Sequence, residues 1–389
     1  MRVPAHDLVQ IRRAHQGPAL AVSGASEAVE LAGVAAALPG DDLPGGAVDN
    51  AALAGLVDAA AARLRAAGHE RDVPACDPDF PRTRIGIVER RVLDVRLGVR
   101  DLAAAAARKA LTRAGIHPEA VVAVVVSTVS SRRRFPAVAA HVHAGLGLRR
   151  SALALDTGMG CNGFLLAWDV AVQALMDHPP GSAALVVAAE ALTRLCDLTD
   201  RETVPIFGDG AGAAVLVRGT GTHRHCVHAW TQGDDGARIQ HEPGNEADDE
   251  PRLRLVHRDG RPVVALDADS RARIRLDGRR VFRDMVRTLP SFVREALAAE
   301  GRTLEDVDRF AFHQANQRML EAITGPAGLD LAPERVLSNI AHVGNTASAS
   351  IPILLAHAEQ KGELRPGERV LLVGFGTGYS LGATTVRWS

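Results

Sequence analysis

The 389-residue sequence has only four cysteines, and none of them belongs to a Cys-x-x-Cys pair. This spacing argues against a zinc ribbon and against a thioredoxin-like redox motif. Scattered thiols in a chain of this length are typical of a reducing compartment, so we expect a cytoplasmic protein. His223, His225, Cys226 and His228 could suggest a metal site. One strand without distant partner ligands is a weak signal for metal, and we expect none.

The chain also lacks long hydrophobic runs and an excess of charge of either sign. Its formal net charge is −1, whereas nucleic-acid-binding proteins usually carry a clear basic excess. Residues 1–28 contain no uninterrupted apolar stretch long enough for a signal peptide, and no run approaches the length of a membrane span. We therefore expect neither a nucleic-acid partner nor membrane association.

What the sequence does contain is an internal repeat. Gly115 ends one predicted helix, and Gly301 ends another. Pro180-Gly181 and Pro366-Gly367 each stand between a predicted helix and a predicted strand, and the interval between them equals the interval from Gly115 to Gly301. Two landmarks that share this interval, which we call the repeat register, predict two structurally similar halves. We expect an N-terminal extension over 1–28, a first half over 29–218 and a second half over 219–389.

Within each half, helices alternate with strands, and the predicted strands are continuous apolar runs. Such runs are typical of sheets that helices cover on both faces. One strand is expected over 121–127 and its counterpart over 308–314, each shortly after the glycine that ends the preceding helix. The sequence therefore predicts an α/β fold built from two related halves.

The repeat register also relates three chemically reactive side chains. His313 is equivalent to Ser127 at a strand end, and Asn345 is equivalent to Met159, which stands shortly before Cys161. If the halves are related by a pseudo-twofold axis, Cys161 and Asn345 begin equivalent helices, and His313 ends a strand on the same side. The three side chains would then meet at the interface between the halves, where ligand sites are common.

Taken singly, each of these residues has a structural alternative. Cys161, in DTGMGCNGF (156–164), is either a small core residue or a nucleophile, because the N–H groups and dipole at a helix start favour the thiolate. His313 is either a structural histidine or a general base or oxyanion donor. Asn345 is either a turn or N-cap residue or a catalytic side chain. Their joint position favours the catalytic interpretation.

Two glycine-rich segments also allow more than one interpretation. Residues 374–378 (GFGTG) follow the last long strand. They form either a tight turn or a source of a backbone N–H that completes an oxyanion hole with the Cys161 N–H. Residues 207–217 (FGDGAGAAVLV) lack the Gly-Lys-Ser/Thr of a phosphate-binding P-loop. We expect a turn there that packs the two halves together.

Six motifs in the same order make the chain resemble a β-ketoacyl-acyl carrier protein synthase III (ketosynthase III) of the thiolase superfamily. They are RIGIVERR (84–91), DTGMGCNGF (156–164), ALTRLCDLTDRETVPIFGDGAGAAVLV (191–217), HQANQRM (313–319), GNTASASIP (344–352) and GFGTG (374–378). The resemblance extends from about residue 29 to the end. It implies the thiolase-like five-layer αβαβα fold made of two duplicated halves, in agreement with the repeat.

For the reaction, the resemblance implies a catalytic site of Cys161, His313 and Asn345. An acyl group passes from acyl-coenzyme A, or from the phosphopantetheine of an acyl carrier protein, to Cys161. A malonyl thioester then loses CO2 while His313 and Asn345 stabilise the enolate, which condenses with the acyl-cysteine to a β-ketoacyl product. The backbone N–H groups of Cys161 and Thr377 hold the oxyanion. The resemblance implies no metal and no redox cofactor.

The resemblance also assigns residues around the catalytic site. Arg84 and Arg201 would contact the nucleotide of coenzyme A, and Arg318 would face the acidic carrier protein. Asn316 would support the catalytic centre. In a homodimer, Phe135 would reach across the interface to close the acyl pocket of the partner subunit.

The chain departs from the family pattern around its cysteine. Gly158-Met159-Gly160 stand where small alanines are usual, and Asn162 replaces a small residue. Met159 is therefore a candidate for the wall of the acyl pocket. Residues 1–28 and the 231–255 loop look like additional material. We interpret these differences as bearing on the acyl substrate, and the additional segments favour a specialised polyketide-type pathway over fatty-acid initiation.

Two other functions stay open at this point. An acyltransferase on the same scaffold would pass the acyl group from Cys161 to a hydroxyl or an amine. Asn345 favours condensation, because this residue chiefly serves to stabilise the enolate. A non-catalytic subunit similar to the chain-length factors of paired ketosynthases is less favoured, because such proteins generally lose the cysteine. The sequence does not determine the acyl chain, the donor or the pathway.

Overall fold

The computed structural model describes residues 28–66, 68, 77–133, 135–200, 202–221, 227–231, 239–242, 252–267 and 273–389. Nearly all of the predicted extension over 1–28, most of the 231–255 loop, and Arg201, His223, His225 and Cys226 lie outside these ranges. Within them, no helix combines the length and the apolar character needed to cross a membrane. The same ranges hold no group of three or more His, Cys, Asp or Glu side chains that could bind a metal ion.

The first sheet is built from the N-terminal part of the chain. Its spatial order is β1 (Val29–Ala37), β7 (Asp209–Arg218), β6 (Ala183–Ala191), β4 (Val121–Ser127) and β5 (Leu153–Thr157). β4 runs parallel to β5 and β6, whereas β7 is antiparallel to both of its neighbours. Two helices, α2 (Val99–Ala114) and α3 (Val138–Leu146), pack their apolar side chains on the outer face. Because both faces are covered, β4 and β6 are buried throughout.

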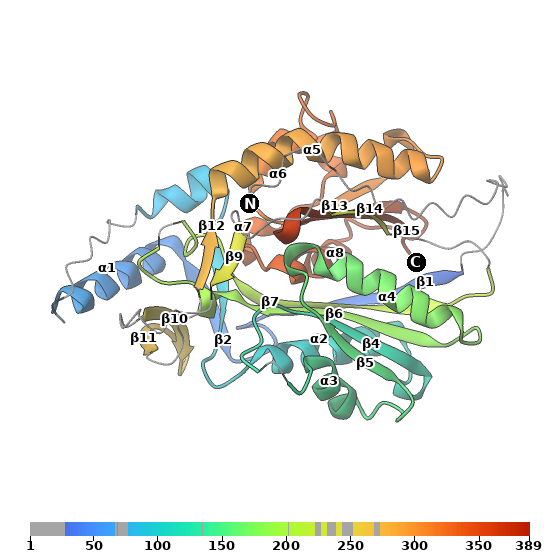
Figure 1. Cartoon of the computed structure of the whole chain (residues 1–389), viewed down its shortest axis with the longest axis horizontal. Coiled ribbons are helices and arrows are strands. Elements are labelled where there is room, and N and C mark those ends of the chain that lie inside the picture. Colours follow the sequence, from blue (N-terminus) through green and yellow to red (C-terminus); the bar gives the residue numbers. More distant parts are fainter. Residues whose placement is uncertain are drawn as a thin grey trace, which may run out of the picture.

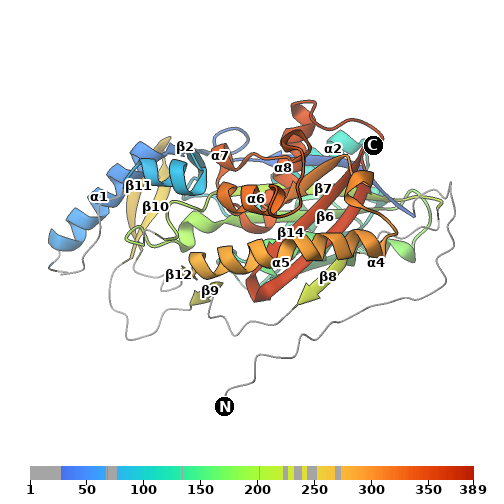
Figure 2. The ribbon, with the colours of Figure 1, turned by 90° about the horizontal axis from the view of Figure 1, so that it is seen from above.

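The second sheet belongs to the C-terminal part. Its order is β13 (Arg309–Phe312), β14 (Arg369–Gly376), β15 (Ser380–Arg387) and β8 (His228–Thr231). The outer face carries α5 (Gly278–Ala299) and α6 (Gln317–Thr324) (Figures 1 and 2). Between the sheets lie α4 (Gly163–Met176) and α8 (Ser350–Gln360). Figure 1 shows the layers in the order helix, sheet, helix, sheet, helix, so the predicted five-layer fold is confirmed.

The two sheets repeat one chain path in the predicted register. The starts of β6 and β14 are separated by the same interval as Gly115 and Gly301. Those two glycines, which follow α2 and the last turn of α5, have φ values of 63° and 67°. The equivalent Gly181 and Gly367 have φ values of 86° and 90°. Glycine adopts these left-handed angles without strain, which explains why the same residue recurs at equivalent turns. The division at 218/219 itself stays a prediction.

A smaller group of elements lies beside the layers, at one end of the molecule (Figure 1). Its bounds are β2 (Gly45–Asp49), α1 (Asn50–Ala66), β3 (Glu89–Leu93), β9 (Ile239–Glu242), β10 (Arg252–Arg258), β11 (Arg261–Asp267) and β12 (Arg273–Leu276). Leu53 and Val57 of α1 pack with Leu192 and Leu255 in an apolar cluster, and Cys161 lies at the border of this cluster. The nucleophile candidate therefore faces apolar surroundings on this side.

The segment FGDGAGAAVLV forms most of strand β7, so the prediction of a turn there is wrong. Its glycines nevertheless bring the two halves together. A Cβ atom on Gly212 would lie 2.7 Å from the Cβ of Pro352 and 2.8 Å from the backbone N of Ile353, both on α8. Without side chains at these strand positions, α8 packs directly on the first sheet.

This packing gives a stability prediction. Gly212→Ala forces α8 away from β7 and should lower the free energy of unfolding by about 1–3 kcal/mol. Gly55→Ala is the matched control, because a Cβ atom there, within α1, meets nothing within 4 Å. The control should be neutral or stabilising by about 0.5–1 kcal/mol. Urea unfolding monitored by circular dichroism compares the two variants, and equal stability would contradict the packing argument.

Candidate active site

Cys161 lies in a tight turn between β5 and α4. Residues Gly160–Asn162 form one turn of 3-10 helix, and α4 follows directly. Gly160 has a φ of 58°, and a Cβ atom there would lie 2.1 Å from the Thr377 hydroxyl. That hydroxyl donates a hydrogen bond to the Met159 carbonyl at 3.1 Å. The turn from one half is thus fastened to the glycine-rich loop of the other half.

The Cys161 side chain rests on the end of β14. A Cβ atom on Gly376 would lie 2.6 Å from the Cβ and 3.2 Å from the Sγ of Cys161, so only glycine leaves room for this side chain. The backbone N–H groups of Cys161 and Thr377 both interact with the sulfur. These are the two N–H groups that the sequence predicts as an oxyanion hole, and the structure brings them to the same atom.

The pKa of the Cys161 thiol is raised to about 12. Burial is the largest cause and the Glu190 carboxylate is the second, while the N–H groups of Cys161 and Thr377 only partly offset them. The N–H groups at the helix start thus lower the thiol pKa in the expected direction, but they do not decide the charge of the free protein. Removal of water from the sulfur outweighs the nearby N–H dipoles, so the resting group is a neutral thiol.

His313 directly follows β13 and is buried, with 1% of its surface exposed. Its Nδ1 lies 2.6 Å from the hydroxyl of Ser350, the first residue of α8, and its ring packs edge-on against Phe375 at 5.1 Å between centroids. Burial lowers the pKa of His313 to about 3, so the imidazole is neutral. Because a hydroxyl can donate or accept, Ser350 is compatible with both neutral tautomers.

Asn345 follows the short helix α7 (Ile340–Val343) and is held by its backbone. Its N–H donates to the Ile206 carbonyl at 2.9 Å, and its carbonyl accepts from the Gly208 N–H at 3.0 Å. The side-chain Oδ1 accepts from the Ala347 N–H at 2.8 Å. No described residue accepts a hydrogen bond from the Nδ2 group, which is therefore the part of this amide available to a substrate.

The end of β14 links the three candidates. Phe375 packs on His313, Gly376 packs on Cys161, and the turn of Cys161 contacts the 3-10 turn Ala347–Ala349 that follows Asn345. These contacts bring the segments that carry the three candidates together at the interface between the halves, and the meeting of the side chains themselves stays a prediction. The catalytic roles of these side chains stay predictions.

The departure at Asn162 is accommodated by two glycines. A Cβ atom on Gly374 would lie 2.4 Å from the Oδ1 of Asn162, and one on Gly382 would lie 2.6 Å from the same oxygen. Asn162 is 1% exposed, and neither amide atom has a hydrogen-bond partner among the described residues. The side chain fills space at the start of α4, between the two halves.

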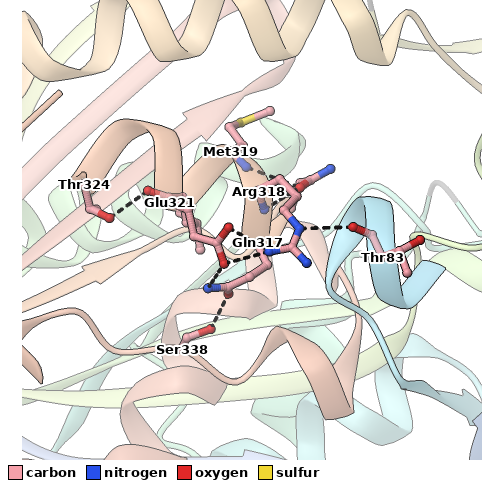
Figure 3. A network of polar contacts seen from close by, with 9 residues as sticks. Thr83, Gln317, Arg318, Met319, Glu321, Thr324 and Ser338 are labelled. Atoms are coloured by element: carbon pink, nitrogen blue, oxygen red, sulfur yellow. Dashed lines mark hydrogen bonds and ion pairs between the residues drawn. The ribbon is translucent and has the colours of Figure 1, made fainter. Parts of the chain in front are cut away.

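Of the predicted coenzyme A and carrier residues, Arg84, Asn316 and Arg318 lie where α6 meets the short helix Pro81–Ile85, and Arg201 lies outside the described residues. Arg84 is exposed on that helix. Arg318 donates from Nε to the Thr83 carbonyl at 3.1 Å and forms an ion pair with Glu321 at 2.9 Å (Figure 3). Glu321 thus partly neutralises the charge that was expected to face a carrier. Asn316 caps α6, with Oδ1 accepting from the Arg318 N–H at 2.8 Å.

The two predicted pocket residues are exposed in the isolated chain. Phe135 is 84% exposed and Met159 is 39% exposed.

Two groups near the catalytic candidates were not predicted from the sequence. Ser350 bonds His313, and Glu190 is a fully buried carboxyl that acts on Cys161. A lone acidic residue within the apolar run SAALVVAAEAL was the available signal for Glu190.

Comparisons with known proteins agree on one family. The model of 3-oxoacyl-[acyl-carrier-protein (ACP)] synthase III matches residues 155–236, and the model of its C-terminal part matches residues 297–388. A β-ketoacyl-[acyl-carrier-protein] synthase III of Rhodospirillum rubrum is 39% identical, with 79% of this chain and 89% of the relative covered. The protein of the same name from Gloeobacter violaceus is 36% identical, with 86% and 98% covered.

Solved structures give the same result. The 3-oxoacyl-(acyl carrier protein) synthase III of Pseudomonas aeruginosa has a TM-score of 0.73 at 29% identity, with 93% of this chain and 98% of that chain covered. A priming β-ketosynthase from a polyketide biosynthetic pathway has a TM-score of 0.76 at 27% identity, with 95% and 98% covered.

The raised pKa of Cys161 predicts how its reactivity depends on pH. The thiolate is the nucleophile, and its fraction rises about tenfold per pH unit well below a pKa of about 12. The rate of iodoacetamide alkylation at Cys161 should therefore rise about tenfold per unit from pH 8 to 10. Mass spectrometry of the Cys161 peptide measures this rate separately from the other cysteines. A plateau below pH 8 would contradict the assignment of a neutral thiol.

Proposed function

Because the chain belongs to the β-ketoacyl-[acyl-carrier-protein] synthase III family, we propose that it joins an acyl group held on Cys161 to a malonyl thioester by decarboxylative Claisen condensation. The acyl donor is acyl-coenzyme A or an acyl carrier protein. The observation that carries the proposal is the contact between Cys161 and the β14 end, with the Cys161 and Thr377 N–H groups at the sulfur and His313 on the adjacent Phe375.

In the first step, the neutral thiol of Cys161 gives its proton to the neutral imidazole of His313. The Cys161 sulfur attacks the thioester carbonyl of the donor while His313 takes the thiol proton, which then leaves with the departing thiol of coenzyme A or phosphopantetheine. The carbonyl oxygen becomes negative in the tetrahedral intermediate. The N–H groups of Cys161 and Thr377 would donate to it, and their interaction with the sulfur supports this role. The raised thiol pKa requires such a base, because few thiolates exist near neutral pH.

In the second step, the malonyl carboxylate leaves as CO2 and its electron pair moves into the thioester as an enolate. Before this step His313 changes tautomer, losing its Nδ1 proton to solvent and taking one on Nε2 from solvent, so that Ser350 now donates to Nδ1. The Nε2–H then donates to the enolate oxygen together with Asn345 Nδ2. The enolate carbon attacks the acyl-cysteine carbonyl, and the Cys161 thiolate leaves and takes up a proton. The steps use only side chains and backbone N–H groups, so we propose that no metal or redox cofactor takes part.

For the biological context, we propose a priming reaction in a specialised polyketide-type pathway. The similarity to a priming β-ketosynthase of a polyketide pathway supports this, as do Met159 and Asn162 beside the nucleophile. Initiation of fatty-acid synthesis is the other context that the curated relatives support. Incubation with a panel of acyl-coenzyme A substrates and either malonyl-coenzyme A or carrier-bound malonate would separate the two by acyl preference.

We also propose a homodimer formed along β5. This strand is the edge of the first sheet, and an edge strand offers unpaired backbone groups to a second chain. Leu153 on β5 is 46% exposed, and Val129 after β4 is 38% exposed. Together with Phe135 and Met159 they leave apolar side chains uncovered on the single chain. A second copy would cover them and place Phe135 at the acyl pocket of the partner subunit.

The carrier protein would dock on α5. Arg280, Arg283 and Arg287 are exposed on this helix at a spacing that puts them on one face. Tyr379, which follows Thr377 closely in the chain, donates a hydrogen bond to Asp284 of α5. This end of α5, which carries the three arginines, therefore lies beside the glycine-rich loop that contacts Cys161. Carrier proteins are acidic, so complementary charge would orient the phosphopantetheine arm toward the thiol.

The proposed role of Asn345 predicts that condensation and loading separate. Asn345→Asp keeps the oxygen that accepts from the Ala347 N–H but loses the Nδ2 donor. Release of CO2 from labelled malonyl thioester should fall by about 10²–10³-fold, while intact-mass analysis still finds acylated Cys161. A parallel loss of loading would contradict the role. An ester or amide product formed from an added acceptor, without CO2 release, would favour acyl transfer instead.

The docking surface predicts a change in KM that depends on the donor. The double variant Arg283→Glu/Arg287→Glu should raise KM for carrier-bound malonate about tenfold or more and leave KM for malonyl-coenzyme A nearly unchanged. Arg365→Glu is the control, because Arg365 precedes the start of β14, at the opposite end of the strand from Cys161. If all three proteins have equal KM values for the carrier substrate, α5 is not the docking surface.

A further inference from the structure

Glu190 is a fully buried carboxyl for which the proposed reaction has no role. It lies next to the end of β6 with 0% of its surface exposed. Ala184, Val186 and Ala188 of the same strand face the layer between the sheets, so Glu190 points into that layer too. Among the described residues, no Lys, Arg or His side chain forms an ion pair with it.

The carboxyl is instead held by hydroxyl and backbone groups from both halves. It accepts hydrogen bonds from the Ser130 hydroxyl at 2.5 Å and from the Ser348 hydroxyl at 2.7 Å. The Thr128 hydroxyl at 3.4 Å and the Val129 N–H at 3.3 Å complete the set. Ser348 is the only one of these donors from the C-terminal half, so Glu190 connects the two halves through a single hydroxyl.

The internal repeat relates the place of this carboxyl to the place beside the Cys161 thiol. In the repeat register, Gly376 is the equivalent of Glu190, and Ser348 is the equivalent of Asn162, next to Cys161. The same contact between a strand end and a helix-starting turn is therefore built twice. In one copy Gly376 leaves space beside the thiol. In the other copy Glu190 fills the equivalent space and binds Ser348.

Ser348 lies within the segment that presents the two other catalytic candidates. Shortly before it, Asn345 bonds the Ala347 N–H. Shortly after it, Ser350 bonds His313. The charge of Glu190 also acts directly on the Cys161 sulfur. A single buried carboxyl thus contacts the segment of Asn345 and Ser350 and influences the nucleophile.

We propose that Glu190 is a positioning residue of this active site, which holds the Asn345–Ser350 segment through Ser348 and, when ionised, opposes formation of the Cys161 thiolate. The proposal deepens the proposed function and rests on it. The groups that face Glu190 are the Thr128 and Ser130 hydroxyls beyond β4, Ser348 before α8 and Cys161 before α4. Asp209, on neighbouring β7, is bound instead to Thr193 and the Leu93 N–H.

This arrangement has a pH dependence of defined sign. Burial raises the pKa of Glu190 to about 7, although its four donors partly offset that effect. Below pH 7 the carboxyl is neutral and places no charge near the sulfur. As pH rises through about 7 the negative charge appears and makes the Cys161 thiolate harder to form. The rate of thiol alkylation should therefore rise less than tenfold per unit near pH 7 and regain the tenfold slope above pH 8.

Glu190→Gln tests this directly, because glutamine keeps the shape and a hydrogen-bond acceptor but cannot ionise. Alkylation of Cys161 by iodoacetamide is measured on the full chain from pH 5.5 to 9. We expect equal rates for the variant and the unmodified protein at pH 5.5. At pH 8.5 the variant should be faster by about threefold to tenfold, as expected for removal of a nearby like charge. A rate ratio that is constant over the whole pH range would overturn the proposal.

Ser348→Ala is the second variant, and it serves if Glu190→Gln does not fold. It removes one donor to the carboxylate, which raises the pKa of Glu190. The pH range over which the alkylation rate rises less than tenfold per unit should therefore move to higher pH. If that pH range stays where it is in the unmodified protein, the link between Ser348 and Glu190 is contradicted. Alkylation needs neither donor nor malonyl substrate. Failure of this test is therefore distinguishable from failure of the proposed condensation, which would show as a lack of acyl loading and CO2 release.

Discussion

The structure depends on one contact that is made twice between its halves. A helix-starting turn from each half rests on a strand end of the other half, inside the layer between two sheets. In one copy Cys161 rests on Gly376, where a Cβ atom would come within 2.6 Å of the cysteine Cβ. In the other copy Ser348 bonds Glu190 at 2.7 Å. These contacts fix where the thiol, the imidazole and the amide can meet.

Burial at this interface determines the charge state of the site. Desolvation raises the pKa of the Cys161 thiol and lowers that of His313, so both groups are neutral at rest. A preformed thiolate–imidazolium pair would need solvation that this layer does not supply. In the proposed reaction, the charges arise when a thioester places its carbonyl oxygen at the N–H groups of Cys161 and Thr377. The proposed reaction therefore begins with proton transfer from Cys161 to His313, and Ser350 can partner either neutral tautomer of the imidazole.

The sequence was sufficient to predict the fold and to place the segments of the three candidates at one interface, because periodicity and repeats reflect chain topology. The repeat register placed His313 and Asn345 at strand and helix ends near Cys161 without any structure. FGDGAGAAVLV was misread as a turn, since its glycines serve helix packing rather than chain reversal. The charge state of Cys161 could not be predicted, because burial is a tertiary property. Glu190, which acts on Cys161, was missed for the same reason, whereas Glu321 stands three residues after Arg318 on one exposed helix face and was available from spacing alone.

The central claim is that Cys161 carries the acyl group before condensation. Intact-mass spectrometry after exposure to a panel of acyl-coenzyme A substrates tests it most directly. We expect one acyl addition per chain, located on the Cys161 peptide, absent in Cys161→Ala, and removed with release of a β-ketoacyl thioester when carrier-bound malonate is added. Acylation that persists in Cys161→Ala, or an acyl-enzyme that malonate does not discharge, would contradict it.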